Sequence, residues 1–401
     1  MKKVCFFLAF FCALTTCPAF SLAENTVSLL ASGQALAGAH SQATLPFELV
    51  GHLIIVKAAV NGSAPDYTFV LDTGSITAVS KKFASRLGLR MEGICSARGS
   101  TGAGSKVCLT RLKNLSLGGL QAGDVSAVVF NPHFSQRAGI RIDGFIGSNF
   151  LRFFKVRIDY GKKLLTLSSD TAPLAPVAGG TLISIAEDWK NAFVPQVAAR
   201  CGKEGFAASI DTGLCDPLSI PAEFLKSTSI DAQLYGNGAM ASGNFGNLDQ
   251  ARLVRLTDLS LGPLQIGKAV ATTQRGQTLA LIGYGILSNF TVTIDYPSKQ
   301  MLLVPNHGGR PMDNLYSAGL ALSRDYAGNT VVTGVWNPSP AANMGLAPGD
   351  VITQIDGRPA KSYTLAGVQK LLFDTSIPAL KLSVREPFGD KNLTLDKKYL
   401  F

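Results

Sequence analysis

The chain has 401 residues, of which 46% are apolar and 16% charged, so it can bury a sizeable core, and wholesale disorder is excluded. Its 41 glycines and 19 prolines favour a β-rich architecture with many turns over a helical bundle. The net charge of +10 is spread along the chain without a block of like charges, which argues against a basic tail that binds nucleic acid.

The first 23 residues are expected to be an export signal. Lys2 and Lys3 precede an apolar run over residues 4–17, and the small residues of the segment 21–23 offer a cleavage site. We therefore expect cleavage after residue 23 and a mature protein that is periplasmic or secreted.

Two alternatives to a cleaved signal stay open. One is an uncleaved membrane anchor, although the apolar run is short for a bilayer span. The other is a lipoprotein signal that ends at Cys17, although Thr16 fits poorly with the small residue that such signals place before the cysteine. No other stretch is long enough to cross a membrane, so no stable span is expected.

An internal repeat follows an irregular lead-in, which the small and polar residues 24–44 predict. Three landmarks occur twice in the same order: Asp-Thr-Gly after a hydrophobic run, Leu-Ser-Leu-Gly, and Ile-Gly followed by Ile-Asp-Tyr. They lie at 69–75 and 208–214, at 114–118 and 258–262, and at 146–160 and 282–296. Shared order with small differences in spacing indicates a duplicated unit, which we place at residues 45–170 and 180–305.

Local patterns predict strands in both copies. Residues 52–60 and 67–71 read as strands around a turn at Asn61-Gly62, and residues 80–87 read as a short helix. Linkers are expected at 168–180 and 306–313, where proline, glycine and polar residues gather.

The last 88 residues, 314–401, differ in character. Gly-Leu-Ala-Pro-Gly-Asp-Val-Ile at 345–352, followed by Ile-Asp-Gly-Arg-Pro, resembles a PDZ domain of the bacterial protease-associated kind. The resemblance implies a peptide-binding groove between the loop 317–322 and a helix at 364–373. Gly319 and Leu320 are the backbone donors expected to bind a terminal carboxylate.

The two Asp-Thr-Gly copies, each followed by an apolar-apolar-Gly element at 145–147 and 281–283, resemble the aspartic protease family of pepsin-like enzymes and retropepsins. The resemblance covers residues 45–305. It implies a mainly β fold of two pseudo-twofold-related β-barrel lobes, which together form an intramolecular pseudo-dimer in a monomeric chain.

The resemblance also implies the site. Asp72 and Asp211 would form a catalytic dyad that shares one proton and activates a water, because two close carboxylates cannot both ionise cheaply, as is known for this same family. The expected supporting residues are Thr73, Gly74, Ser75, Thr212 and Gly213, with close packing at Gly147 and Gly283. Leu214 departs from the Ser75 pattern, so the two carboxyl environments should differ.

Other acidic and glycine-rich features receive simpler interpretations. Asp159 and Asp295 are expected to make local turns, and Asp216 to be a solvated loop charge. Residues 98–105 and 235–246 are candidates for substrate flaps, although the first lacks the tyrosine of pepsin.

Four cysteines beyond the signal allow three pairings, and we expect the local one, Cys95–Cys108 and Cys201–Cys215. Each bridge would close a loop of about 15 residues, worth about 3 kcal/mol. The spacings do not resemble zinc sites, so no metal or cofactor is expected.

The leading hypothesis is an aspartic endopeptidase whose PDZ domain binds the C-terminus of a peptide or substrate. In a variant of this hypothesis, the PDZ domain captures the chain's own Leu400-Phe401 tail and regulates it. The alternatives are a non-catalytic peptide-binding protein that keeps the protease fold, and a scaffold that acts only through its PDZ domain. No nucleic-acid partner is expected.

Overall fold

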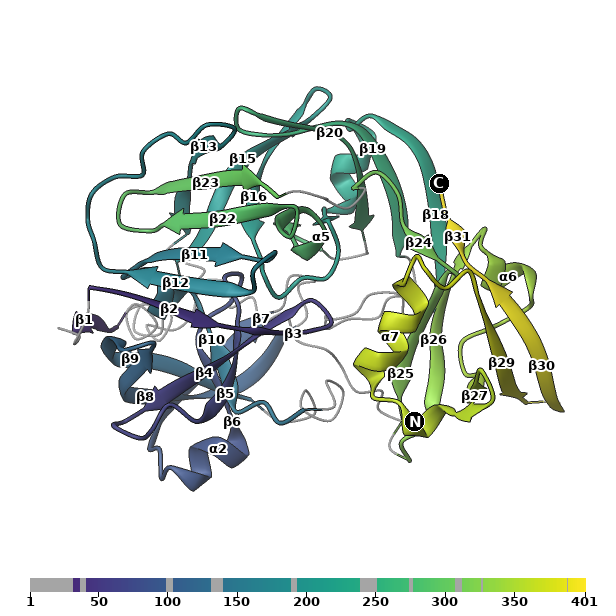
Figure 1. Ribbon diagram of the computed structural model, residues 1–401, viewed down its shortest axis with the longest axis horizontal. Helices are drawn as coiled ribbons and strands as arrows, with labels where there is room; N and C mark the ends of the chain where they lie inside the picture. The colour runs from purple at the N-terminus through teal and green to yellow at the C-terminus, as the bar shows by residue number, and fades with distance from the viewer. Residues whose placement is uncertain are drawn as a thin grey trace, which may run out of the picture.

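The computed structural model describes residues 32–36, 41–98, 104–130, 140–188, 193–238, 251–273, 277–306, 312–325, 327–387 and 389–401. These residues form three large β-sheets, one small sheet and a few short helices (Figure 1), so the predicted mainly β class is confirmed. The expected export signal lies outside the described residues. Within them, no helix is both long and apolar enough to cross a membrane.

The first repeat builds a nine-stranded sheet. Its strands are β1 (Gln34–Leu36), β3 (Glu48–Val50), β4 (Leu53–Val60), β5 (Tyr67–Leu71), β6 (Ala78–Ser80), β7 (Met91–Arg98), β8 (Gly104–Leu117), β9 (Leu120–Phe130) and β10 (Gly144–Ile146). They lie in the order β1-β9-β6-β10-β5-β4-β8-β7, with β3 beside β4.

Local chemistry explains the elements that the sequence predicts here. Asn61 and Gly62 both have positive φ, 53° and 81°, which closes the β4–β5 hairpin and confirms the predicted turn. Helix α2 (Lys81–Arg86) begins after Ser80, whose hydroxyl accepts a hydrogen bond from the Phe83 N–H at 3.1 Å. The predicted helix is therefore confirmed.

The second repeat repeats the strand order of the first. Its strands are β14 (Ala186–Asp188), β15 (Val194–Cys201), β16 (Glu204–Ile210), β17 (Leu218–Ser219), β18 (Ile230–Gly238), β19 (Arg252–Leu261), β20 (Leu264–Thr273) and β21 (Ala280–Ile282). The order β14-β15-β16-β21-β17-β20-β19-β18 matches β3-β4-β5-β10-β6-β9-β8-β7 strand for strand. The short helices of the two repeats are α4 (Ser148–Leu151), α5 (Tyr284–Leu287) and the 3-10 helix η2 (Ala222–Lys226).

A six-stranded sheet joins the repeats, in the order β13-β23-β22-β11-β12-β2. Its strands are β13 (Thr181–Ser184), β23 (Gln300–Pro305), β22 (Phe290–Asp295), β11 (Lys155–Asp159), β12 (Leu164–Ser168) and β2 (Gln42–Pro46). Strands β11 and β22, one from each repeat, pair in the middle (Figure 1). A continuous hydrophobic core runs from this sheet into both repeats.

The six-stranded sheet tests two predictions made from the sequence. Asp159 and Asp295 end their strands and accept hydrogen bonds from the Lys162 and Ser298 N–H groups at 2.9 Å, so the predicted local turns are confirmed. The expectation of an irregular segment at 24–44 is wrong for its described residues in β1 and β2. Because β2 gains a full ladder with β12, long-range pairing overrides its weak local preference.

Residues 314–401 form a separate small core with its own strands and helices. These are β24 (Tyr316–Ser317), β25 (Leu320–Arg324), β26 (Thr330–Asn337), α6 (Pro340–Asn343), β27 (Val351–Ile355), β28 (Arg358–Pro359), η3 (Ala360–Ser362), α7 (Leu365–Phe373), β29 (Ala379–Glu386), β30 (Gly389–Asp396) and β31 (Lys398–Tyr399). Helix α7 begins after Thr364, whose hydroxyl accepts from the Gly367 N–H at 3.0 Å, so the predicted helix is confirmed.

The C-terminal domain shares a sheet with the second repeat. Strand β18 pairs with β26 over residues 235–238 and 334–337, and this joins both parts in one fourteen-stranded sheet (Figure 1). Trp336, 6% exposed, packs at this joint with Leu234 and Leu253 of the second repeat. Trp336 is therefore a core residue of this joint.

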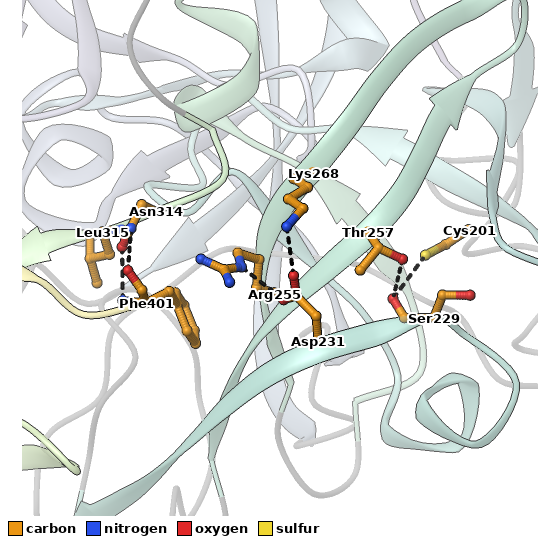
Figure 2. Close-up of polar contacts among 9 residues, drawn as sticks. All are labelled: Cys201, Ser229, Asp231, Arg255, Thr257, Lys268, Asn314, Leu315 and Phe401. Carbon is orange, nitrogen blue, oxygen red and sulfur yellow. Dashed lines mark hydrogen bonds and ion pairs between the residues drawn. The ribbon is translucent and has the colours of Figure 1, made fainter.

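The C-terminal residues 398–401 pack against the same joint. β31 pairs with β24, and the Leu400 N–H donates to the Leu315 carbonyl at 3.0 Å. The Phe401 N–H donates to Asn314 Oδ1 at 2.9 Å (Figure 2). Leu400 and Phe401 also pack on the Trp336 cluster. The tail is thus part of the interface in this structure.

Replacing Trp336 with Ala is expected to lower the free energy of unfolding by about 3–5 kcal/mol, because it empties a buried site at the joint. Chemical denaturation measures this value. The matched control is Tyr235→Ala on β18, because that ring is 51% exposed and its loss should cost about 0.5 kcal/mol or less. Equal losses for the two variants would contradict a packed joint.

The predicted Cys95–Cys108 bridge is wrong, since Cys108 carries a free thiol. In the β7–β8 ladder Cys108 lies opposite Ile94, while Cys95 lies opposite Val107. Successive side chains of a strand point to opposite faces, so an offset of one residue does not bring two cysteines together.

The predicted Cys201–Cys215 bridge is also wrong. Cys201 is a buried free thiol whose Sγ lies 3.9 Å from the Ser229 carbonyl oxygen (Figure 2). In the β15–β16 hairpin, the backbone of Cys201 lies opposite that of Glu204, next to the turn. Cys215 follows the other end of β16. The length of β16 separates these ends by roughly 20 Å, far beyond the Cα distance of about 4–7 Å in a disulfide.

Candidate active site

Each Asp-Thr-Gly segment leaves a buried strand at the same place in its sheet. Asp72 follows β5 and Asp211 follows β16, and their N–H groups donate to the Ile146 and Ile282 carbonyls, both at 2.9 Å. Because β10 and β21 run parallel to β5 and β16, the adjacent apolar-Gly elements hold both aspartates in equivalent positions.

Four buried hydrogen bonds lock the two segments together. The Thr73 N–H donates to Thr212 Oγ1 at 3.0 Å, and the Thr212 N–H donates to Thr73 Oγ1 at 3.1 Å. Each hydroxyl also donates to the opposite repeat, from Thr73 to the Ile210 carbonyl at 2.7 Å and from Thr212 to the Leu71 carbonyl at 2.9 Å. We call this contact between the two Asp-Thr-Gly segments the seam. Segments 139 residues apart therefore form one rigid unit.

The glycines let the two carboxyl groups approach. A Cβ on Gly74 would lie 2.3 Å from Asp211 Cγ, and a Cβ on Gly213 would lie 2.9 Å from Asp72 Cγ. The same glycines donate their N–H groups to Oδ1 of their own aspartates, Gly74 at 3.0 Å and Gly213 at 2.8 Å. Only residues without a side chain fit between the two acids.

Burial governs the electrostatics of Asp72, which is 2% exposed. Desolvation raises the pKa of Asp72 to about 6, against the lowering effect of hydrogen bonds from Ser75, Gly74 and Asp211. Together these hydrogen bonds favour the charged form of the Asp72 carboxyl group.

Asp211 is fully buried and differs from Asp72. Desolvation raises the pKa of Asp211 well above its usual value, and the negative charge of Asp72 raises it further. Leu214 stands where the first segment has Ser75, so only backbone donors oppose this shift. The pair therefore favours a state with one proton, held more firmly at Asp211.

Two further glycines pack closely against the residues that follow each Asp-Thr-Gly segment. A Cβ on Gly147 would lie 2.3 Å from the Ile76 carbonyl carbon, and a Cβ on Gly283 would lie 2.3 Å from the Asp216 carbonyl oxygen. The close packing that the sequence predicts at these positions is confirmed.

Sequence reasoning missed a tyrosine beneath the seam. Ser148 donates through Oγ to the Thr73 carbonyl at 2.7 Å, and Tyr296 OH lies 3.1 Å from the same Oγ. Tyr296 belongs to the second repeat and Ser148 to the first. The signal available in the sequence was the recurrence of tyrosine in both Ile-Asp-Tyr landmarks.

Sequence reasoning also missed His52, between β3 and β4. Its Nε2 lies 2.9 Å from the Gly213 carbonyl oxygen and must donate, because a carbonyl can only accept. Desolvation lowers the pKa of His52 to about 4, so the ring stays neutral at higher pH. A residue of the first repeat thus holds the Asp211 segment.

Replacing His52 with Phe should reduce any activity of the site by about tenfold or more, because the Gly213 carbonyl loses its donor and its segment loses an anchor. His52→Gln keeps an N–H donor and should recover most of that loss. Steady-state kinetics of both variants measure the effect, and equal activities of the Phe and Gln variants would contradict this role.

Asp216 lies in a less polar setting than the sequence predicts. It is partly buried and accepts a hydrogen bond from Thr272 Oγ1 at 2.8 Å, so its interpretation as a solvated charge is wrong. Desolvation raises the pKa of Asp216. The candidate flap tips, 99–103 and 239–246, lie outside the described residues, and only the strands that lead to them are described.

The expected carboxylate-binding loop is held by internal bonds. The Gly319 N–H donates to Ser317 Oγ at 3.0 Å, and its carbonyl accepts from the Trp336 N–H at 2.8 Å. Leu320 begins β25, which pairs with β26. A ligand would have to displace the Ser317 hydroxyl to use the Gly319 donor.

Comparison with known families covers parts of this chain. Residues 56–150 match the aspartyl protease family model, and residues 331–376 match a PDZ domain model. The chain therefore contains an aspartyl protease domain and a C-terminal PDZ domain, both of which imply peptide partners. No curated protein matches the chain.

Proposed function

We propose that the chain is an aspartic endopeptidase in which Asp72 and Asp211 form the catalytic dyad. One observation carries the proposal: the crossed threonine bonds hold two buried carboxyl groups of opposite repeats against each other. The second Asp-Thr-Gly segment lies beyond the matched residues 56–150, but its strand order and contacts repeat those of the first. We infer two lobes related by a pseudo-twofold axis, at 45–170 and 180–305.

The pKa differences suggest separate roles for the two acids. The Asp72 carboxylate takes a proton from a water, whose oxygen attacks the peptide carbonyl carbon, while the Asp211 carboxyl group gives its proton to the carbonyl oxygen. The nitrogen of the resulting tetrahedral diol then takes the proton from Asp72, the C–N bond breaks, and one diol hydroxyl gives its proton to Asp211. This leaves a carboxylic acid, an amine and the dyad in its starting state. The protons belong to the pair, so the apparent pKa values do too.

The PDZ domain, at 314–401, would bring peptides to this dyad. An extended peptide can add as a strand beside β25, with its terminal carboxylate near Gly319 and Leu320. Helix α7 lies beside the turn that carries His52, since a Cβ on Gly51 would come within 3.8 Å of Gln369 Oε1. Tethering there would raise the local substrate concentration. We also propose that residues 1–23 are a signal peptide and that the mature chain acts in the periplasm or outside the cell.

A peptide mixture incubated with the purified protein between pH 3 and 8 tests the proposal. Mass spectrometry should detect new internal termini. A peptide with a secondary alcohol at the scissile carbonyl should inhibit at least about a hundredfold more tightly than the matched methylene peptide, because the alcohol resembles the tetrahedral state. No new termini at any pH would contradict the proposal.

The raised carboxyl pKa values predict the pH dependence of stability. A buried carboxyl group with a folded pKa near 6 stabilises the fold below its unfolded pKa of about 4, and this stability is lost as the pH rises through about 6. The free energy of unfolding should therefore fall between pH 4 and 7 more steeply in the wild type than in Asp72→Asn. Equal pH slopes in the two proteins would contradict a desolvated Asp72.

A further inference from the structure

Each aspartate comes directly after the last residue of its strand, where the alternation of side chains still indicates its face. Side chains alternate along a strand, so Asp72 lies in phase with Val70, and Asp211 with Ser209. Residues in register with Val70 and Ser209 on the neighbouring strands share those faces. Two matched rows of side chains, one in each repeat, therefore extend from the two carboxyl groups.

The first row is apolar throughout. Its register partners, across β4-β5-β10-β6-β9, are Ile55, Val70, Phe145, Ala78 and Val128. All five belong to one hydrophobic cluster, which Val107 and Leu109 of β8 extend. The five side chains are 0–6% exposed, so an apolar substrate side chain would chiefly contact Ile55 and Phe145, the two with the most exposed surface, and gain by leaving water.

The second row is polar at four of the five matched positions. Across β15-β16-β21-β17-β20 it comprises Gln196, Ser209, Leu281, Ser219 and Thr272. Because the strand orders match, each residue of the second row can be compared with its equivalent in the first. Thr272 stands where the first row has Val128, and Ser219 where it has Ala78. The two halves of the site thus differ in chemistry although their backbones match.

Hydrogen bonds link the second row to further acceptors. Thr272 Oγ1 donates to Asp216 Oδ2 at 2.8 Å, and Gln277 Nε2 donates to Ser219 Oγ at 2.8 Å. Gln277 is 3% exposed, and none of the described residues donates to its Oε1. Asp216 and Thr272 keep part of their surface in solvent. Asp216 therefore offers an acceptor that solvent already reaches, and the buried Gln277 amide oxygen is a second acceptor without a donor among the described residues.

Resting on the proposed peptidase function, we propose that this site selects peptides with unlike flanks. The first row takes an apolar side chain on one side of the scissile bond. The second row takes a hydrogen-bond-donating side chain, such as Lys, Arg, Asn or Gln, on the other side. An apolar side chain there would leave buried acceptors unpaired, which costs far more than a misfit of one methylene.

The first arm of the test is the cleavage profile of a peptide library, with every position near the cut varied. Donor residues should be preferred over apolar ones by at least about tenfold in kcat/KM on one side of the cut and disfavoured on the other. Asp216→Asn removes the negative charge of this acceptor while the Thr272 hydroxyl can still donate to the new amide oxygen, so it should reduce the preference for Lys and Arg several-fold. The control Asp159→Asn, on the six-stranded sheet, should leave the profile unchanged.

The second arm measures binding of the same peptides to the wild-type protein, with a reduced amide at the scissile bond. It needs neither turnover nor a folded variant. Asymmetric binding without cleavage would support the two rows and contradict the peptidase proposal. Cleavage with the same residue class preferred on both sides would overturn the two rows alone, and absence of both binding and cleavage would overturn both.

Discussion

Asp72→Asn is expected to abolish peptide hydrolysis, with kcat falling at least about a hundredfold and up to about 10⁴-fold. Asparagine keeps the shape of the side chain but cannot accept the proton of the attacking water. The Gly74 N–H can still donate to the amide oxygen, so the seam should persist. Initial rates on a peptide from the library, together with thermal unfolding, measure loss of chemistry separately from loss of fold.

Asp159→Asn is the matched control for this variant. Asp159 also belongs to a repeated landmark, but its carboxyl group caps a local turn through the Lys162 N–H. Its replacement should change the rate by less than about threefold. If Asp72→Asn retains wild-type activity, or if both variants lose it equally, the catalytic assignment of Asp72 is wrong.

Gly74→Ala is expected to have the second largest effect. Its new Cβ would lie 2.3 Å from Cγ and 2.6 Å from Oδ1 of Asp211, a carboxyl group that the Gly213 N–H holds in place. The clash should destabilise the fold by about 1–3 kcal/mol. A displacement of the acids by about 1 Å should also cost about a hundredfold in rate.

Gly93→Ala separates this clash from the general effect of replacing glycine. Gly93 is an exposed residue of β7, has no positive φ, and a Cβ there would meet nothing within 4 Å. Chemical denaturation and peptide hydrolysis should leave this variant close to wild type. Wild-type activity in Gly74→Ala would mean that the two acids do not approach each other as described.

Local sequence predicted the elements whose signals are local. The Asn61-Gly62 turn needs two positive φ values, which these residues tolerate, and α2 and α7 begin at Ser80 and Thr364 because their hydroxyls cap free N–H groups. The Asp-Thr-Gly duplication likewise pointed to two equivalent loops, because each copy follows a hydrophobic strand.

Features that depend on distant pairing could not be predicted in this way. The β18–β26 ladder and the hydrogen bond of His52 to Gly213 join segments about 100 and 161 residues apart, and no periodicity marks either partner. The cysteine pairs failed for the same reason, because proximity in sequence says nothing about strand register. The polar second row became visible only once register aligned Ser219 with Ala78 across the repeats.

The central claim is that one carboxyl group from each repeat works as a single proton-sharing unit. The most direct measurement compares kcat for Asp72→Asn, Asp211→Asn and the double variant, after thermal unfolding confirms that all three fold. Residues that act as a unit are not additive, so the double variant should be no slower than the slower single variant. A loss in the double variant equal to the product of the two single losses, or full activity in either single variant, would contradict the claim.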